Sequence, residues 1–122
     1  MRPFERFGAG RAARDLALLV YRLSRTWPND ERYGLTAQAR RAAVSIGANL
    51  SEGVTRRGSR ELRRFLDIAR GSHGELQFLL WMAGDLGYIE ATGRAELERQ
   101  MARTGALLWN LYRNTADDAD GV

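Results

Sequence analysis

The sequence predicts an all-α fold, an antiparallel up-down four-helix bundle in one domain that spans residues 1–122. Apolar residues recur at spacings of three and four along most of the chain, which is the period of an amphipathic helix. No segment alternates strictly between apolar and polar residues, as a half-buried strand does. Turn-forming residues divide the chain into four segments with short connections. A chain of 122 residues is long enough for a single hydrophobic core.

Four helices are expected, at about residues 10–26, 36–54, 59–86 and 93–115. The first ends before WPNDERYG, because Pro28 disfavours a helical conformation at the residue before it. Thr36, Ser59 and Thr92 are expected to cap the second, third and fourth helices. Gly87 is expected to end the third helix, because glycine readily adopts the left-handed conformation that follows a helix C-terminus.

The core is expected where the apolar stripes of the four helices meet. These stripes hold Leu16, Leu19, Val20 and Leu23, then Ala39, Ala43, Ile46 and Leu50, then Leu62, Phe65, Leu66, Ala69, Leu76, Leu80 and Ala83, and finally Leu97, Met101, Leu108, Leu111 and Tyr112. Phe78 and Trp81 lie off the third stripe, and Trp109 lies beside the fourth. Because large apolar groups left outside a core mark interfaces, these three residues predict self-association.

Basic charge is concentrated in one part of the chain. The net charge is +4 and all 19 basic residues are arginine, which suits an anionic partner but also suits the codon bias of a GC-rich genome. Residues 40–70 hold eight arginines and three carboxylates, a net charge of +5, so the rest of the chain is net −1. A local cluster predicts a binding surface better than the total charge does.

Four arginines flank the turn between the second and third helices: Arg56, Arg57, Arg60 and Arg63. The N-terminus of the third helix adds its own partial positive charge at Ser59. One hypothesis is that these arginines contact the phosphate backbone of RNA or DNA without reading bases. The alternatives are that they only solvate the turn, or that they meet an acidic protein surface.

A polar stripe runs beside the core on the second and third helices and holds Arg41, Asn49, Glu52, Arg64 and Glu75. If the hairpin folds about residues 55–58, Arg41 lies level with Glu75. Glu52 then lies near Arg60 or Arg64. We expect interhelical pairs at the rim of the core, which fix register even where they add little stability. A direct role in ligand binding is the alternative.

The sequence holds little that supports catalysis. It has one histidine and no cysteine, and GVTRRGS lacks the lysine and the preceding strand of a phosphate-binding loop. His73 is expected to be a satisfied core residue rather than a general base. The carboxylates show no metal-ligand spacing. We therefore expect no catalytic residue, no metal site, no cofactor and no enzymatic activity.

Two absences bear on the compartment. No apolar run approaches the roughly 18 residues that a membrane span needs. The start MRPFERFGAG lacks the apolar region of a secretory signal. A cytoplasmic protein that does not contact membranes is expected.

Three motifs in residues 21–89 resemble a known family. They are P-x-x-E-x-Y-G-L-T-x-Q at 28–38, R-R-A-A-V-S-I-x-x-N-x-x-E-G at 40–53 and R-F-L-x-I-A-x-G-S-x-x-E-L at 64–76. In this order they resemble the small four-helix-bundle proteins encoded by intervening sequences in bacterial large-subunit (23S) ribosomal RNA genes. The sequence departs from that pattern at Gly47, where proline is common, and at His73 and Gly74, where larger residues are usual.

The resemblance implies a homo-pentameric, barrel-shaped assembly of bundles. A distant branch, the accessory variability determinants of diversity-generating retroelements, binds a reverse transcriptase and nucleic acid. Two hypotheses follow for this chain. The first is a non-catalytic homo-oligomer that binds RNA or DNA, and the second is an adaptor or scaffold for a reverse transcriptase or a ribosome-associated partner.

Overall fold

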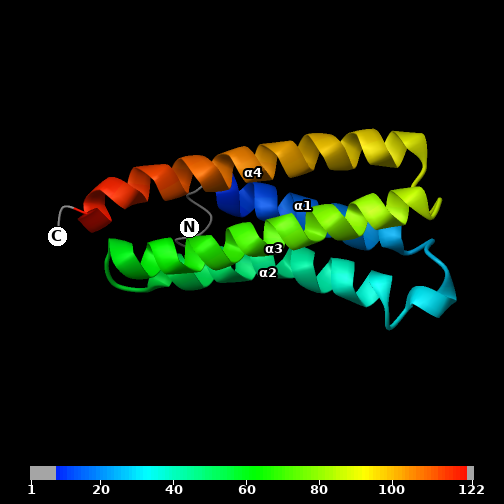
Figure 1. The fold of residues 1–122 in the computed structure, drawn as a ribbon, viewed down its shortest axis with the longest axis horizontal. Helices are drawn as coiled ribbons and strands as arrows, with labels where there is room; N and C mark the ends of the chain where they lie inside the picture. Colours follow the sequence, from blue (N-terminus) through cyan, green and yellow to red (C-terminus); the bar gives the residue numbers. More distant parts are fainter. Residues whose placement is uncertain (1–7, 121–122) are drawn as a thin grey trace.

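The structure, a computed structural model, describes residues 8–120 and the side chains of residues 8–115. It contains four α-helices, α1 (Gly8–Ser24), α2 (Leu35–Thr55), α3 (Ser59–Asp85) and α4 (Ala91–Asp120), and a 3-10 helix, η2 (Asn29–Glu31). The described residues include no strand, and the chain reverses direction at each loop between the α-helices (Figure 1). The predicted all-α fold with four helices is confirmed.

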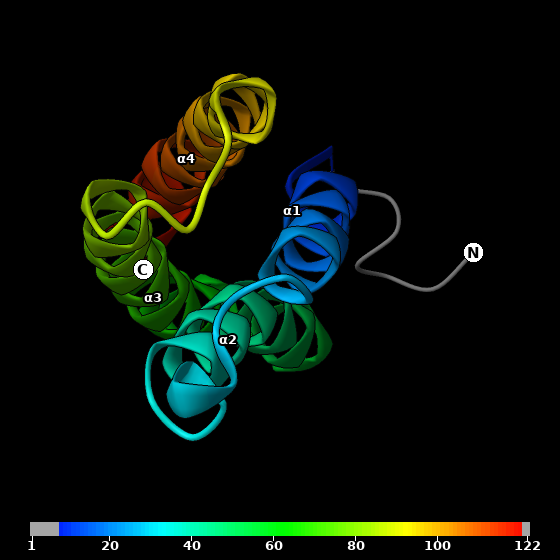
Figure 2. The same ribbon diagram turned by 90° about the vertical axis from the view of Figure 1, so that its right-hand side faces the viewer.

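Each α-helix packs against two others, in the cyclic order α1, α2, α3 and α4, around a common core (Figure 2). The predicted core residues are buried except for five at its edges, which are partly buried: Leu23, Leu62, Leu80, Leu111 and Tyr112. Leu79 is buried where Leu80 was expected to be. The largest side chains with no exposed surface include Leu16, Ile46 and Leu66, one from each of three helices.

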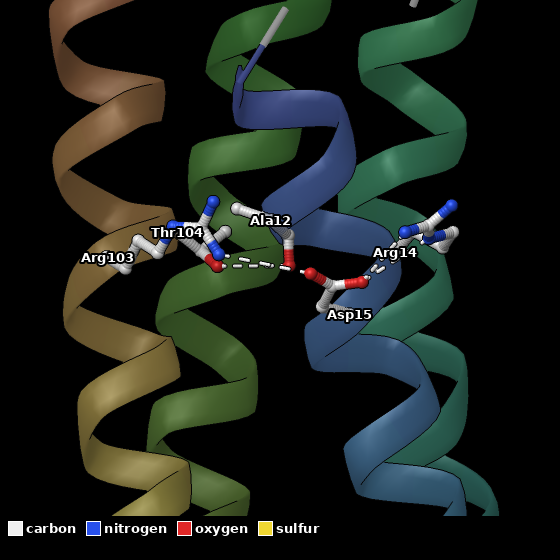
Figure 3. Close-up of polar contacts among 5 residues, drawn as sticks. All are labelled: Ala12, Arg14, Asp15, Arg103 and Thr104. Atoms are coloured by element: carbon white, nitrogen blue, oxygen red, sulfur yellow. Dashed lines mark hydrogen bonds and ion pairs between the residues drawn. The ribbon is translucent and has the colours of Figure 1, made fainter. Parts of the chain in front are cut away.

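The seam between α1 and α4 contains a buried polar contact (Figure 3). The hydroxyl of Thr104, which has no exposed surface, lies 3.4 Å from the carbonyl oxygen of Ala12 and donates to it. Beside it, Asp15 lies 3.9 Å from Arg103 of α4 and 3.1 Å from Arg14 of α1. A buried hydroxyl without a partner is costly, so this contact favours one register of α4 against α1.

The described helices differ in length. Among the described elements, α1 has 17 residues and α4 has 30. The first residue of α1, Gly8, lies beside Leu107, so α4 continues past the start of α1 (Figure 1). Leu62, Leu111 and Tyr112 lie toward this end and are partly buried.

The predicted helix caps at Thr36, Ser59 and Thr92 are wrong. The first helical hydrogen bonds are accepted by the carbonyls of the residues just before α2, α3 and α4, namely Gly34, Gly58 and Glu90. The three predicted residues therefore lie within the first turn of each helix. For α2 the cap comes from the 3-10 helix, where Glu31 Oε1 accepts from the backbone N–H of Leu35 at 3.1 Å.

The end that holds the α1–α2 and α3–α4 loops is closed by side chains from both. Glu31 Oε2 accepts from the hydroxyl of Tyr88 at 3.0 Å, and the buried ring of Trp27 packs on Tyr88 with centroids 6.0 Å apart. Gly87 ends α3 with a φ of 80°, as predicted. The N–H groups of Gly87 and Tyr88 donate to the carbonyls of Gly84 and Ala83, which is the Schellman pattern.

The hydrogen bond to Glu31 raises the pKa of Tyr88 above its ordinary value of 10.0, and burial and the charge of Glu31 act in the same direction. A raised pKa in the folded state means that this contact stabilises fully below pH 10 and is lost as the pH rises through the folded value. We expect Tyr88→Phe to lower the free energy of unfolding at neutral pH. The difference from wild type should shrink above pH 10, as measured by urea denaturation. The exposed matched control Tyr33→Phe should leave the free energy of unfolding unchanged both at neutral pH and above pH 10.

Candidate nucleic-acid interface

The turn between α2 and α3 is tight because two glycines permit it. A Cβ at Gly53 would lie 2.9 Å from Cβ of Phe65 and 3.2 Å from Cδ1 of Leu62, so the two helices approach closely here. Gly58 has a φ of 85°, a conformation that favours glycine. The chain therefore re-enters a helix within three residues after α2, and the arginines on both sides of the turn are brought to one end of the bundle.

The four predicted phosphate-binding arginines differ in their surroundings. Nη2 of Arg56 lies 2.6 Å from Oε1 of Glu52, so its charge is paired. Arg63 is half-buried, with its guanidinium 4.7 Å from the centroid of the Tyr112 ring. Arg57 and Arg60 are exposed and make no hydrogen bond, ion pair or ring contact with the described residues. These two arginines present unpaired charge to solvent.

The predicted interhelical ion pairs are not formed among the described residues. Arg41 and Glu75 are both exposed and are not bonded to each other. Glu52 pairs with Arg56, and Nε of Arg64 lies 2.9 Å from Oε2 of Glu61. Partners three or four residues away in sequence are neighbours on the same helical surface, so they are reached before residues of the next helix. Such exposed pairs contribute about 0–1 kcal/mol each.

A chain of neutral polar groups joins α2 to α3 instead. The hydroxyls of Ser45 and Ser72 lie 2.8 Å apart across the seam. Nδ2 of Asn49 donates to the carbonyl oxygen of Ser45 at 2.8 Å and to its hydroxyl at 2.9 Å. Asn49 was expected near Arg64 of α3, but both of its hydrogen bonds go to Ser45 of its own helix.

Two aromatic rings and two arginines meet where α3 faces the C-terminal half of α4. The rings of Trp109 and Tyr112 are nearly parallel, at 21°, with centroids 5.9 Å apart. The guanidinium of Arg70 lies 4.9 Å from the Trp109 centroid and 5.0 Å from the Tyr112 centroid. Arg63 covers Tyr112 as described above. This cluster was not expected, because Tyr112 was assigned to the core; the spacing of Arg63 and Arg70, two helical turns apart, was its only sequence signal.

A groove of about 990 Å³ lies between α3 and α4, nearer to the loop that joins them. Its small lining residues include Gly74, Ala102 and Ala106. Phe78 and Trp81 also line it and pack edge to face with centroids 6.2 Å apart. Phe78 is 54% exposed and Trp81 is 67% exposed, while Trp109, outside the groove, is 45% exposed. All three lie outside the core as predicted, and their part in self-association stays a prediction.

His73 lies beside this groove and is half-buried. Its Nε2 lies 2.8 Å from the carbonyl oxygen of Met101. Because a carbonyl oxygen only accepts, Nε2 carries the hydrogen and donates it. The expectation that His73 is satisfied is confirmed, although the ring lies at the edge of the core and not inside it.

Within the described residues there is no group of three or more histidine and carboxylate side chains that could hold a metal ion. None of the described helices combines the length and the apolar character that crossing a membrane requires.

Comparison with known proteins gives one family. The model of the family described as 23S rRNA-intervening sequence protein matches residues 7–110, which includes all of α1, α2 and α3 and most of α4. A search of curated proteins finds no match. The matched region contains the α2–α3 turn with its arginines and the groove between α3 and α4. It also contains Arg63, Arg70 and Trp109, but not Tyr112.

Two glycines test how closely α3 and α4 approach. A Cβ at Gly71 would meet nothing within 4 Å, so Gly71→Ala should stabilise by about 0.5–1 kcal/mol through helix propensity. A Cβ at Gly105 would lie 2.9 Å from Cε1 of His73, so the ring would have to leave Met101. Losing that hydrogen bond, worth about 0.5–1.5 kcal/mol, should cancel the gain in Gly105→Ala. Equal stabilisation of both variants in urea denaturation would contradict the packing.

Proposed function

The chain belongs to the 23S rRNA-intervening sequence protein family, and we propose that it is a non-catalytic homo-oligomer that binds the phosphate backbone of RNA or DNA. The observation that supports this best is the exposed pair Arg57 and Arg60 at the α2–α3 turn. Guanidinium groups match phosphate in geometry, and they are always charged at physiological pH.

The position of these arginines also favours an anion. Arg57 lies in the turn and Arg60 lies in the first turn of α3, where the backbone N–H groups of the helix end add partial positive charge. The other arginines nearby have contacts inside the protein, such as the pair of Arg56 with Glu52. Backbone binding of this kind has little sequence preference and weakens as salt is added.

Self-association would multiply these contacts. Phe78 and Trp81 form an exposed aromatic pair on α3, and aromatic side chains of this size commonly anchor interfaces. We propose that antiparallel bundles associate through this pair into a ring, a pentamer as the family resemblance implies. Each subunit would add one copy of Arg57 and Arg60, so weak single contacts would add up to a useful affinity.

The groove beside Phe78 and Trp81 favours a second candidate function, an adaptor that binds a protein such as a reverse transcriptase or a ribosome-associated factor. A groove of about 990 Å³, lined by apolar side chains and by charged residues such as Asp85 and Arg94, is large enough to receive side chains of a partner. In this case the arginines would meet an acidic protein surface. A reverse-transcriptase gene beside this one would favour the adaptor, and a position inside a ribosomal RNA gene would favour RNA binding.

The first functional test removes the exposed charges. In Arg57→Gln/Arg60→Gln, binding to labelled RNA or DNA should weaken about equally for unrelated sequences, because phosphate contacts carry no sequence information. Affinity is measured by fluorescence anisotropy between about 50 and 200 mM salt. The slope of log affinity against log salt should fall by roughly one for each arginine that no longer binds a phosphate.

The matched control is Arg25→Gln/Arg99→Gln, which removes the same charge from exposed positions away from the turn. It should leave the salt slope close to that of wild type. If the Arg57 and Arg60 variant binds as tightly as wild type with the same slope, these arginines only solvate the turn and the adaptor becomes the better proposal.

The second test concerns assembly. Static light scattering at micromolar concentration should give a multimer for wild type, and Trp81→Glu should shift it toward the monomer. Because the side chain is 67% exposed, the helical circular dichroism should be retained. Tyr33→Glu is the control, since Tyr33 is 86% exposed and lies in the α1–α2 loop. A wild-type monomer in this measurement would rule out the ring.

A further inference from the structure

We infer that Trp109 and Tyr112, with Arg63 and Arg70, form a stacking platform for the bases of single-stranded nucleic acid. The inference rests on the proposed function and deepens it, because it names the ligand class: single strands, in preference to duplexes.

The geometry of the cluster suits stacking of flat aromatic groups, such as bases, on its rings. The two rings lie on consecutive turns of α4, are nearly parallel at 21°, and have centroids 5.9 Å apart. Arg70 lies within 5.0 Å of both centroids and Arg63 lies 4.7 Å from that of Tyr112. The arginines hold the rings from the side of α3, while Trp109 keeps 45% of its surface exposed.

The two rings lie on a different face of α4 from the core residues. Leu108, the neighbour of Trp109 in sequence, is fully buried in the core. Trp109 and Tyr112 instead lie on the flank of α4 that faces α3, beyond the point where Leu107 meets the first residue of α1. These positions lie at the edge of the core and not inside it.

The charges around the platform favour a polyanion as the occupant. Arg60 precedes Arg63 by three residues, which places the two side by side on the surface of α3. Exposed charge at Arg57 and Arg60 therefore lies beside Arg63, while Arg70, further along α3, lies 3.9 Å from the carboxylate of Asp67. A charged groove with aromatic rings is the usual combination for single strands, where bases stack and phosphates follow the cations. In a duplex the faces of the bases are already covered by their neighbours, so only the phosphate contacts remain.

The same contacts separate Trp109 from the aromatic pair assigned to self-association. Phe78 and Trp81 pack on each other, and among the described residues no arginine covers either ring. Trp109 has Arg70 beside it and lies outside the groove that Phe78 and Trp81 line. We therefore assign Trp109 to the ligand and the other two rings to assembly.

The test compares three probes of one unstructured sequence about 16 nucleotides long, near the upper site size of a single-strand-binding module. The probes are single-stranded RNA, single-stranded DNA and a blunt RNA duplex. Trp109→Leu should weaken binding of both single strands by roughly 5- to 100-fold, the range for the loss of one base–aromatic stack. Duplex binding should change by less than about twofold, because phosphate contacts are retained.

Two variants keep the test specific. Trp109→Phe keeps an aromatic face and should recover most of the single-strand affinity. Tyr33→Leu removes another exposed ring that has an arginine over it, Arg32 at 5.4 Å, but far from the turn, and should change nothing. Light scattering of Trp109→Leu should match that of wild type; if this variant dissociates, Trp109 belongs to the interface and the inference is wrong.

The outcomes also separate this inference from the proposed function. Suppose that Arg57→Gln/Arg60→Gln lowers the affinity for all three probes. If Trp109→Leu then lowers the affinity for single strands and duplex equally, or for neither, backbone binding is supported and the stacking platform is wrong. If neither variant changes the affinity for any probe, the proposed function fails with it. Loss of RNA binding alone, with single-stranded DNA unaffected, would also overturn stacking, because both strands offer the same base faces.

Discussion

The packing of α1 against α2 and α4 is the constraint on which the rest of the structure depends. Its residues Leu16 and Val20 are almost wholly buried, and its carbonyl at Ala12 accepts a hydrogen bond from the hydroxyl of Thr104 in the neighbouring helix α4. Where α1 is present, the apolar stripes close around one another. Leu107 of α4 lies beside Gly8, the first described residue of α1, and two residues further along α4 Trp109 is 45% exposed.

The fold could be predicted because apolar residues recur at the helical period, and this pattern indicates which residues are buried. Ile46 and Leu66 recur with their neighbours at the helical period, and both have no exposed surface. Helix starts were predicted less well, because they depend on contacts that the period does not encode. The cap of α2 comes from Glu31, which the 3-10 helix brings within 3.1 Å of Leu35 N, and the start of α3 depends on the positive φ of Gly58.

The candidate site could be predicted only in part. Exposure of Arg57 and Arg60 follows from their place at a turn. Residue counting across the hairpin places Ser72 level with Arg41, whereas its hydroxyl contacts Ser45, about one helical turn further along α2. Counting does not give the direction in which a long side chain turns. Glu52 therefore meets Arg56 on its own helix, although an interhelical pair was expected. The contact of Arg70 with Trp109 depends on the lateral register of α3 and α4, which the loop between them does not reveal.

The two ends of the bundle use their polar groups differently. At the loop end, both carboxylate oxygens of Glu31 accept hydrogen bonds from the protein, so little remains for a ligand. At the turn end, Arg57 and Arg60 repel each other and neighbouring arginines, and no carboxylate among the described residues is paired with either. Like charges held together destabilise the folded state, and a bound polyanion removes that repulsion. In the proposed function, a polyanion bound at these arginines would therefore also stabilise the turn that presents them.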